Sequence, residues 1–262
     1  GLAASKEMRT SRFQAREASK FAKTLSYELK PGPTDSIRYP GAGPFDLRLG
    51  YSSLGEFLPR LLKRDYVISA QTRFSPALMD YTGKGLFVPY AEKIQAGLSI
   101  TDCRANPLYQ YKYPQQLYSS FEAIPPVVVN SLLFIENRFL LDPRQPLANP
   151  AVDWPRFGMA AYTQVAKMLH LPGQSAGGST LATQLEKYRH SPDGLTVSGG
   201  EKIRQMVSAT VRAYQDGPQT LKARQNVVRD YLNSVPLSAV PGHGEVHGMA
   251  EGLRVWYGAD FN

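Results

Sequence analysis

The sequence has a single cysteine, Cys103, so it can form neither a disulfide framework nor a cluster of thiolate metal ligands. It also lacks any run of about 18 apolar residues, the length that a helix needs to cross a bilayer. Internal repeats and low-complexity tracts are missing as well, which excludes a solenoid. What remains is a globular composition: 262 residues, of which 42% are hydrophobic and 20% charged, enough for one large core or two small ones.

Acidic residues are fewer than basic ones. The 22 Asp and Glu against 30 Lys and Arg give a net charge of +8, which favours anionic partners such as phosphate, pyrophosphate, an acidic membrane face or nucleic acid. A basic surface that only confers solubility is the alternative. Nucleic acid is the least favoured partner, because the sequence shows neither clustered arginines nor an aromatic stacking platform.

Histidine is also scarce, with four in the chain. Two of them, His243 and His247, have the i,i+4 spacing of a helical zinc motif, but glycine and proline interrupt the segment that holds them. We therefore predict no metal site built from protein side chains.

The apolar patterns predict an α+β fold that is predominantly helical. Before residue 99 they indicate a small accessory α+β module with the following elements: a helix over 5–29, which is either a surface helix or the continuation of a membrane anchor, a strand over 45–50, a helix over 54–63 and a strand over 66–71. A hairpin over 97–113 then leads into predicted helices over 127–140, 154–169, 180–188, 202–214 and 221–235. We expect two domains, residues 1–98 and 99–262.

Glu136 lies where the pattern of the helix over 127–140 would place a hydrophobe. A carboxylate on an apolar face loses water, which raises its pKa and suits it to proton transfer near neutral pH. The alternative is that Glu136 lies at the helix edge and pairs with Arg138 or another surface cation. The segment alone leaves both interpretations open.

A glycine-rich stretch over 173–180 comes close to a phosphate-binding loop, but Ser179 stands where that loop has its lysine. It is therefore no nucleotide-binding loop. A glycine-rich turn before a helix N-terminus can still hold an anion, with Ser179 or Thr180 as the helix cap. Thr180, Gln184 and Lys187 share one face of that helix, so an anion site and a capped helix with a solvated lysine are competing interpretations.

The next predicted helix begins with a charged turn. Glu201, Lys202 and Gln205 lie on one polar face at i,i+3 and i,i+4 spacing. Taken alone, this pattern indicates a solvated first turn.

Taken in order, these segments resemble the peptidoglycan glycosyltransferases of family 51, the lysozyme-like transglycosylase module of class A penicillin-binding proteins and monofunctional transglycosylases. The most specific likeness is to the motif Gly-Gly-Ser-Thr-x-x-x-Gln-x-x-Lys, at residues 177–187. The family's first motif, Ile-Pro-Pro followed by a helix with Glu-Asp-x-x-Phe, is similar to residues 124–140. Its third and fourth motifs are matched at Lys202 and at residues 231–233, and its closing Tyr-Phe-Gly stretch resembles residues 248–258.

The resemblance begins near residue 100 and implies a specific reaction. Such enzymes polymerise glycan strands from lipid II by inverting glycosyl transfer and release undecaprenyl pyrophosphate. Glu136 would be the general base on the acceptor 4-hydroxyl. The implied substrate-binding residues are Gly178, Ser179, Thr180, Gln184, Lys187, Lys202, Arg204, Gln205 and Asn233. One base is sufficient for this chemistry, since pyrophosphate leaves readily once its charge is matched.

The resemblance also implies a place and partners. We expect the protein on the periplasmic face of a bacterial inner membrane, held by an anchor in a segment that this sequence does not contain. Its partners would be lipid II, the growing glycan strand, the membrane surface and other cell-wall synthesis proteins.

Several motif positions differ from the family. Gln205 stands where the family has its second glutamate, which is associated with the pyrophosphate and a divalent cation, Mg or Mn. An amide anchors a metal less strongly than a carboxylate, so Glu201 is a candidate substitute. Arg229 and Asn137 likewise replace acidic residues of the family. The alternative function is therefore a weak or inactive scaffold that binds glycan or lipid pyrophosphate.

A lysozyme-like hydrolase with Glu136 as its acid is a further alternative. The predicted row of cations disfavours it, because a neutral glycan leaving group needs a proton rather than positive charge.

Overall fold

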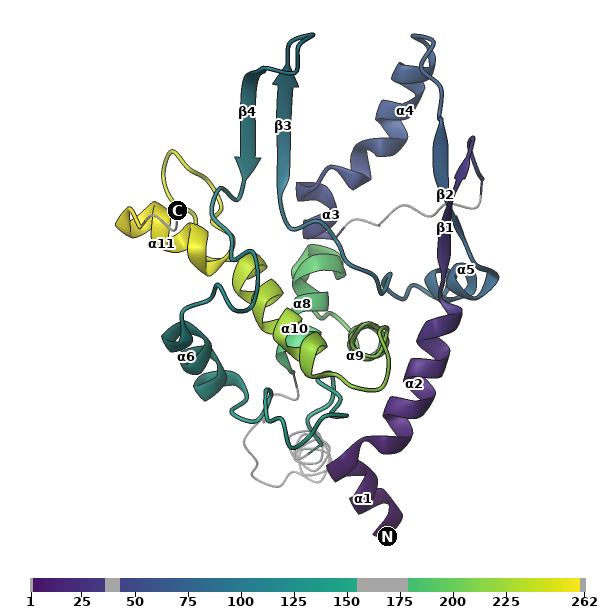
Figure 1. The fold of residues 1–262 in the computed structure, drawn as a ribbon, viewed down its shortest axis with the longest axis vertical. Coiled ribbons are helices and arrows are strands. Elements are labelled where there is room, and N and C mark those ends of the chain that lie inside the picture. The colour runs from purple at the N-terminus through teal and green to yellow at the C-terminus, as the bar shows by residue number, and fades with distance from the viewer. Residues whose placement is uncertain (1, 36–42, 155–178, 260–262) are drawn as a thin grey trace.

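The computed structural model describes residues 2–35, 43–154 and 179–259, and most of its elements are helices (Figure 1). The elements before residue 96 are α1 (Leu2–Thr10), α2 (Arg12–Thr24), β1 (Tyr27–Pro31), α3 (Pro44–Arg48), η1 (Tyr51–Ser53), α4 (Leu54–Leu62), β2 (Ala70–Phe74) and α5 (Pro76–Gly83). Those that follow are β3 (Ala96–Thr101), β4 (Pro107–Tyr113), α6 (Pro126–Glu136), α8 (Leu181–His190), η2 (Pro192–Gly194), α9 (Gly199–Ala213), α10 (Leu221–Ser234) and α11 (Met249–Tyr257). No helix in these ranges is long and apolar enough to span a bilayer.

The second half of the chain is built around α8, which packs against both α9 and α10, while α11 packs against α10. Apolar side chains at helical spacing give each helix one buried stripe. Leu181 on α8 and Val228 and Leu232 on α10 are all at most 2% exposed, and α6 adds Val129 to the same core. The site residues therefore stand on helices that a common core holds in place.

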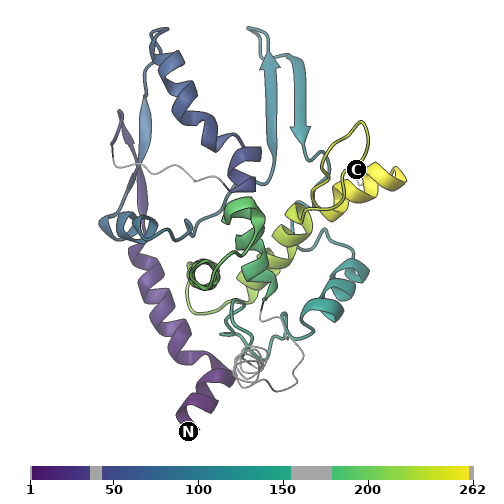
Figure 2. The ribbon, with the colours of Figure 1, turned by 180° about the vertical axis from the view of Figure 1, so that it is seen from behind.

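The first half of the chain does not stand apart from these helices. Helix α2 packs on α9, and α3 packs on α8 (Figure 2). A second apolar cluster combines Ala22 of α2 and Leu78 of α5 with Val211 of α9. The predicted boundary between residues 98 and 99 falls within strand β3, and the division into two domains stays a prediction.

Two antiparallel strand pairs make up the sheets. Strand β1 pairs with β2, and β3 pairs with β4 in a hairpin that projects from the body beside α4 (Figure 1). The register sets Leu98 opposite Tyr111 and Ile100 opposite Tyr109. Because side chains alternate across a strand, these residues share one apolar face of the hairpin.

Most predicted elements of the second half are confirmed, with small shifts at their ends. The structure has the hairpin and the helices near 180–188, 202–214 and 221–235, as well as α4 in the first half. Helix α6 ends at Glu136, four residues earlier than predicted, because the backbone of Asn137 is extended. The helix predicted over 154–169 lies outside the described residues, apart from Trp154.

Three predictions in the first half differ from the structure. Residues 44–48 form helix α3 instead of a strand, since Pro44 presets the first helical turn and the helix buries Phe45 and Asp46 together. The long opening helix is divided at Ser11, whose φ of 51° is left-handed, and it ends at Thr24 before strand β1. The strand expected over 66–71 lies four residues later, in β2.

Candidate active site

Glu136 is the last residue of α6, at the point where the chain leaves the helix. It follows Leu132 and Leu133 by about one turn, and both leucines pack against the main core. Glu136 is half-buried, so its carboxylate lies at the edge of the apolar face with access to solvent. The structure therefore places Glu136 between the two positions that the sequence left open, at the edge of the apolar face.

Gln184 of α8 holds this carboxylate. Its Nε2 donates to Oε2 of Glu136 over 3.0 Å. Its Oε1 accepts hydrogen bonds from the hydroxyls of Tyr188 and Tyr231, each over 3.4 Å. Because the tyrosines donate to the amide oxygen, the amide nitrogen must face Glu136. The amide thus orients the carboxylate and leaves Oε1 of Glu136 without a donor in the part of the chain that is described.

Tyr188 and Tyr231 are site residues that the sequence analysis did not assign to the site. Burial raises the pKa of Tyr231, and the nearby Tyr188 and Glu136 raise it further. Its hydroxyl therefore stays protonated and remains a donor to Gln184. Tyr188 lies one turn after Gln184 on α8, so the spacing alone predicts that the two side chains share one face of the helix. Tyr231 reaches the site only because α10 packs against α8.

Two lysines extend the site away from Glu136. The Nζ of Lys187 lies 4.5 Å from the centre of the Tyr188 ring. Burial lowers the pKa of Lys202, and the positive charge of Lys187 lowers it further. Both lysines are half-buried, and neither has a carboxylate partner within residues 2–35, 43–154 and 179–259. Two cations that repel each other and have no counter-ion among these residues suit the binding of an anion.

Side-chain hydrogen bonds cap the first turn of α8, the helix that carries Gln184 and Lys187. Thr180 is the N-cap: its hydroxyl accepts from the backbone N–H of Thr183, and the Thr183 hydroxyl accepts from the N–H of Thr180. Ser179 lies 3.2 Å from the Thr183 hydroxyl. The expected cap is therefore confirmed, and it anchors the turn on which Gln184 and Lys187 depend. Gly178 lies outside the residues that the structure describes.

The order of a carboxylate, a glutamine and a lysine along this surface matches what the resemblance implies. A family model described as Transglycosylase matches residues 104–262, more than half of the chain. The chain belongs to the transglycosylase family. This membership and the mainly helical α+β fold confirm the resemblance and the predicted fold class, and they indicate a glycosyltransferase of peptidoglycan synthesis in general terms. No curated protein matches the chain.

Gln205 of the transglycosylase faces away from the lysines, into a closed polar network. It is fully buried, and its Nε2 donates to the hydroxyls of Ser191, over 2.9 Å, and Thr196, over 3.0 Å. Ser191 also donates to the buried carboxylate of Glu201, over 2.5 Å. Glu201 in turn pairs with Arg204. A glutamate at position 205 would place a second negative charge beside Glu201, whereas the neutral amide satisfies its neighbours without that repulsion.

Asn233 is also committed to the fold. Its amide accepts from the backbone N–H of Tyr118 and donates to the carbonyl of the same residue, both over 2.9 Å. At 1% exposure, it pairs backbone groups that would otherwise be buried without partners. The structure therefore brings Glu136 and Gln184 into contact, places Lys187 one turn after Gln184 on α8, and lets the charge of Lys187 act on Lys202. Arg204, Gln205 and Asn233 belong to other networks. Their assignment to substrate binding stays a prediction.

A divalent cation does not fit the protein ligands of this site. Among the described residues, no group of three histidine, cysteine or acidic side chains could hold a metal ion. The carboxylate of Glu201, the candidate substitute for the family's second glutamate, is already taken by Ser191 and Arg204. The chemistry of this site is therefore described through its side chains alone.

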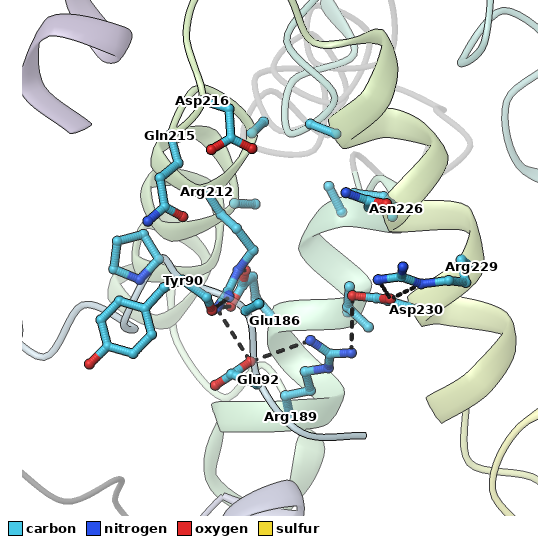
Figure 3. A pocket seen from close by; sticks show the side chains of 18 residues that line it. Tyr90, Glu92, Glu186, Arg189, Arg212, Gln215, Asp216, Asn226, Arg229 and Asp230 are labelled. Carbon is cyan, nitrogen blue, oxygen red and sulfur yellow. Dashed lines mark hydrogen bonds and ion pairs between the residues drawn. The ribbon is translucent and has the colours of Figure 1, made fainter. Parts of the chain in front are cut away.

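A separate pocket of about 150 Å³ lies between residues 89–92 and helices α8, α9 and α10 (Figure 3). Glu92 points into it and meets Arg189 at 3.3 Å and Arg212 at 3.5 Å. Arg189 also meets Asp230 at 3.5 Å. Arg229, which replaces a glutamate of the family, pairs with the same Asp230 at 2.6 Å.

The charges around this pocket neutralise one another. Burial alone would raise the pKa of Glu92, but Arg212 and His190 lower it to about 2. Burial alone would lower the pKa of His190, but Glu92 and Asp46 raise it to about 9. Both groups are therefore charged at pH 7. The ion pairs of this network join Glu92 to helices α8 and α9, and they offset the buried charges of Arg189 and Arg212.

Proposed function

We propose that this transglycosylase polymerises glycan strands from lipid II by inverting glycosyl transfer, with release of undecaprenyl pyrophosphate. The observation that carries the proposal is the carboxylate of Glu136, oriented by Gln184 and followed by Lys187 and Lys202 without counter-ions. A base next to a cationic surface suits a reaction in which a hydroxyl attacks and a charged group leaves.

In the proposed reaction, Glu136 accepts the proton of the acceptor 4-hydroxyl as the oxygen attacks the anomeric carbon of the donor sugar. The bond from that carbon to the pyrophosphate breaks, and the pyrophosphate leaves with the electron pair. Lys187 and Lys202 offset the negative charge that develops on it. Attack from the face opposite the leaving group inverts the anomeric carbon.

An exposed apolar surface beside Glu136 supports a lipid-linked substrate. Val127, Phe134, Ile135 and Phe139 are between 65% and 74% exposed on or next to α6. Large apolar side chains in water mark a contact with lipid or protein. We assign this surface to the lipid carrier at the periplasmic face of the inner membrane, where the growing strand and other cell-wall synthesis proteins would meet it.

The proposal is tested by incubating the chain with labelled lipid II, with and without magnesium or manganese, and separating the products by length. We expect glycan strands and released undecaprenyl pyrophosphate. Strands that form in the presence of a chelator would show that the lysines suffice without a metal. If lipid II binds but no strand forms under any condition, the protein is the binding scaffold, the function that Gln205 favours.

The lysine pair gives a second prediction. Lys187→Met and Lys202→Met should each lower kcat/KM for lipid II by about tenfold to a hundredfold, because each removes a charge-assisted contact worth about 1.5–3 kcal/mol. Initial rates over a range of lipid II concentrations measure the effect. Lys222→Met is the matched control, since Lys222 is 69% exposed and meets only Glu122, at 3.7 Å. Equal rates for all three variants would show that neither Lys187 nor Lys202 contributes to the reaction.

A further inference from the structure

A second cleft, of about 690 Å³, opens where the β3–β4 hairpin meets α3 and the loop before α11. Its walls include Arg48 of α3, Tyr111 and Tyr113 of β4, and the loop residues His243 and His247. The hairpin lies at the end of the molecule away from α6, which carries Glu136 (Figures 1 and 2), and none of the residues that line the cleft belongs to the candidate active site. The cleft is therefore separate from the candidate active site, and its size is in the range of small-ligand sites.

Arg48 is an uncommitted cation in this cleft. It is half-buried, its guanidinium lies 5.1 Å from the centre of the Phe45 ring, and no ion pair or hydrogen bond joins it to any described residue. Burial lowers its pKa to about 10, Tyr113 and the more distant carboxylate of Glu245 offset part of this effect, and Arg189 adds to it, so Arg48 remains charged at pH 7. A charge removed from water without a counter-ion is costly, so a carboxylate that paired with it would be bound well.

His247 gives a second, independent sign of a ligand. It is 7% exposed, and its Nδ1 has no hydrogen-bond partner among the described residues, whereas its Nε2 lies 3.2 Å from the carboxylate of Glu245. Burial and the charge of Arg48 lower its pKa, so the ring is neutral at pH 7 and can donate or accept. The Tyr113 ring lies 6.0 Å from His243 and 6.2 Å from His247, between centres. These rings give the cleft an aromatic wall next to unpaired polar atoms.

The positive charge of the cleft is less exposed to solvent than its negative charges. Arg48 lies partly buried within the cleft, whereas Asp193 and Glu245 are exposed carboxylates that also line it. A ligand with several negative charges would be repelled by these two carboxylates. A ligand with one carboxylate and one ammonium group would match both levels of the cleft.

We propose that this cleft binds a short peptide segment with a free carboxylate, which pairs with Arg48, and an ammonium group, which meets Asp193 and Glu245. Tyr111 and Tyr113 would pack against the peptide. Peptides of this chemistry are carried by peptidoglycan strands and also occur free. The choice of the strand as their source rests on the proposed function, whereas binding of the peptide does not.

The test uses acetylated Ala-Lys-Ala as the probe and follows the ring signals of His243 and His247 by NMR during titration. We expect saturable shifts, and at least about tenfold weaker binding when the C-terminus is amidated or the lysine is acetylated. Arg48→Gln should weaken binding of the free acid to the level of its amide. Arg60→Gln, an exposed change on α4 outside the cleft, should leave it unchanged.

Equal binding of the acid and the amide, or no shift at millimolar peptide, would overturn the proposal. If Arg48→Gln does not fold, Tyr111→Ser replaces it, because Tyr111 is 48% exposed and its loss should still weaken binding. Glycan strands with peptides, stripped strands and free peptide then distinguish the source. The assay contains no polymerisation step, so an inactive transglycosylase would still bind the probe.

Discussion

Glu136→Gln is expected to abolish formation of glycan strands while binding of lipid II persists. The side-chain amide keeps the size of the carboxylate, and its oxygen can still accept from Nε2 of Gln184, so the local geometry survives. What it loses is the ability to take a proton, and the loss of a general base lowers kcat by about 10² to 10⁴. Strand synthesis from labelled lipid II measures kcat, and equilibrium binding measures the affinity.

Glu122→Gln is the matched control for this change. Glu122 is 65% exposed, belongs to the same half of the chain and lies 3.7 Å from Lys222, outside the candidate active site. Its variant should polymerise at the native rate. An active Glu136→Gln variant would remove this residue from the reaction, and a variant that lost binding together with turnover would show that the change had disturbed the fold of the site.

The second large effect is on stability. Glu92→Gln should lower the free energy of unfolding by about 3 to 5 kcal/mol at pH 7, the usual result when one partner leaves a buried ionic network. Arg189 and His190 would keep their charges with less to offset them. Urea denaturation of both proteins measures the change. Glu17→Gln is the control, since Glu17 is exposed and its loss should cause no measurable change.

The dependence of stability on pH identifies the cause. The pKa of Glu92 is about 2 in the fold against an ordinary 4.5, so its contribution is present above pH 4.5 and is lost as the pH falls towards 2. The pKa of His190 is raised from 6.5 to about 9, so its contribution is present below pH 6.5 and is lost as the pH rises towards 9. Both slopes should flatten in Glu92→Gln, and an unchanged pH profile would contradict the network.

The part of the site that lies on one helix could be predicted from the sequence. Thr180, Gln184 and Lys187 have fixed spacing on α8, and a helical period alone places them on one face. Lys202 and Tyr231 reach that face only because α9 and α10 pack against α8. Periodicity predicts which side of each helix is buried but not which helix packs against it. This half of the site could therefore not be predicted from the sequence.

The roles of motif residues were harder to predict, because a polar residue in a motif can stabilise the fold instead of binding substrate. Gln205 and Asn233 have the residue types that substrate binding needs, yet both are buried and their hydrogen bonds stay within the protein. Short apolar patterns were ambiguous for a different reason. Residues 44–48 alternate like a strand, and only the packing of α3 on α8 shows which side chains are buried together.

The ion pairs of Glu92 with Arg189 and Arg212 cross the boundary at which the match to the family model begins. The stretch that resembles the transglycosylase family begins at residue 104, yet a carboxylate twelve positions earlier neutralises two arginines inside it. The stretch that the family model matches is therefore shorter than the set of residues that this ionic network joins. Arg189 and Arg212 have a charge partner upstream of that stretch, so substitutions at Glu92 and at either arginine should have effects on stability that are not additive.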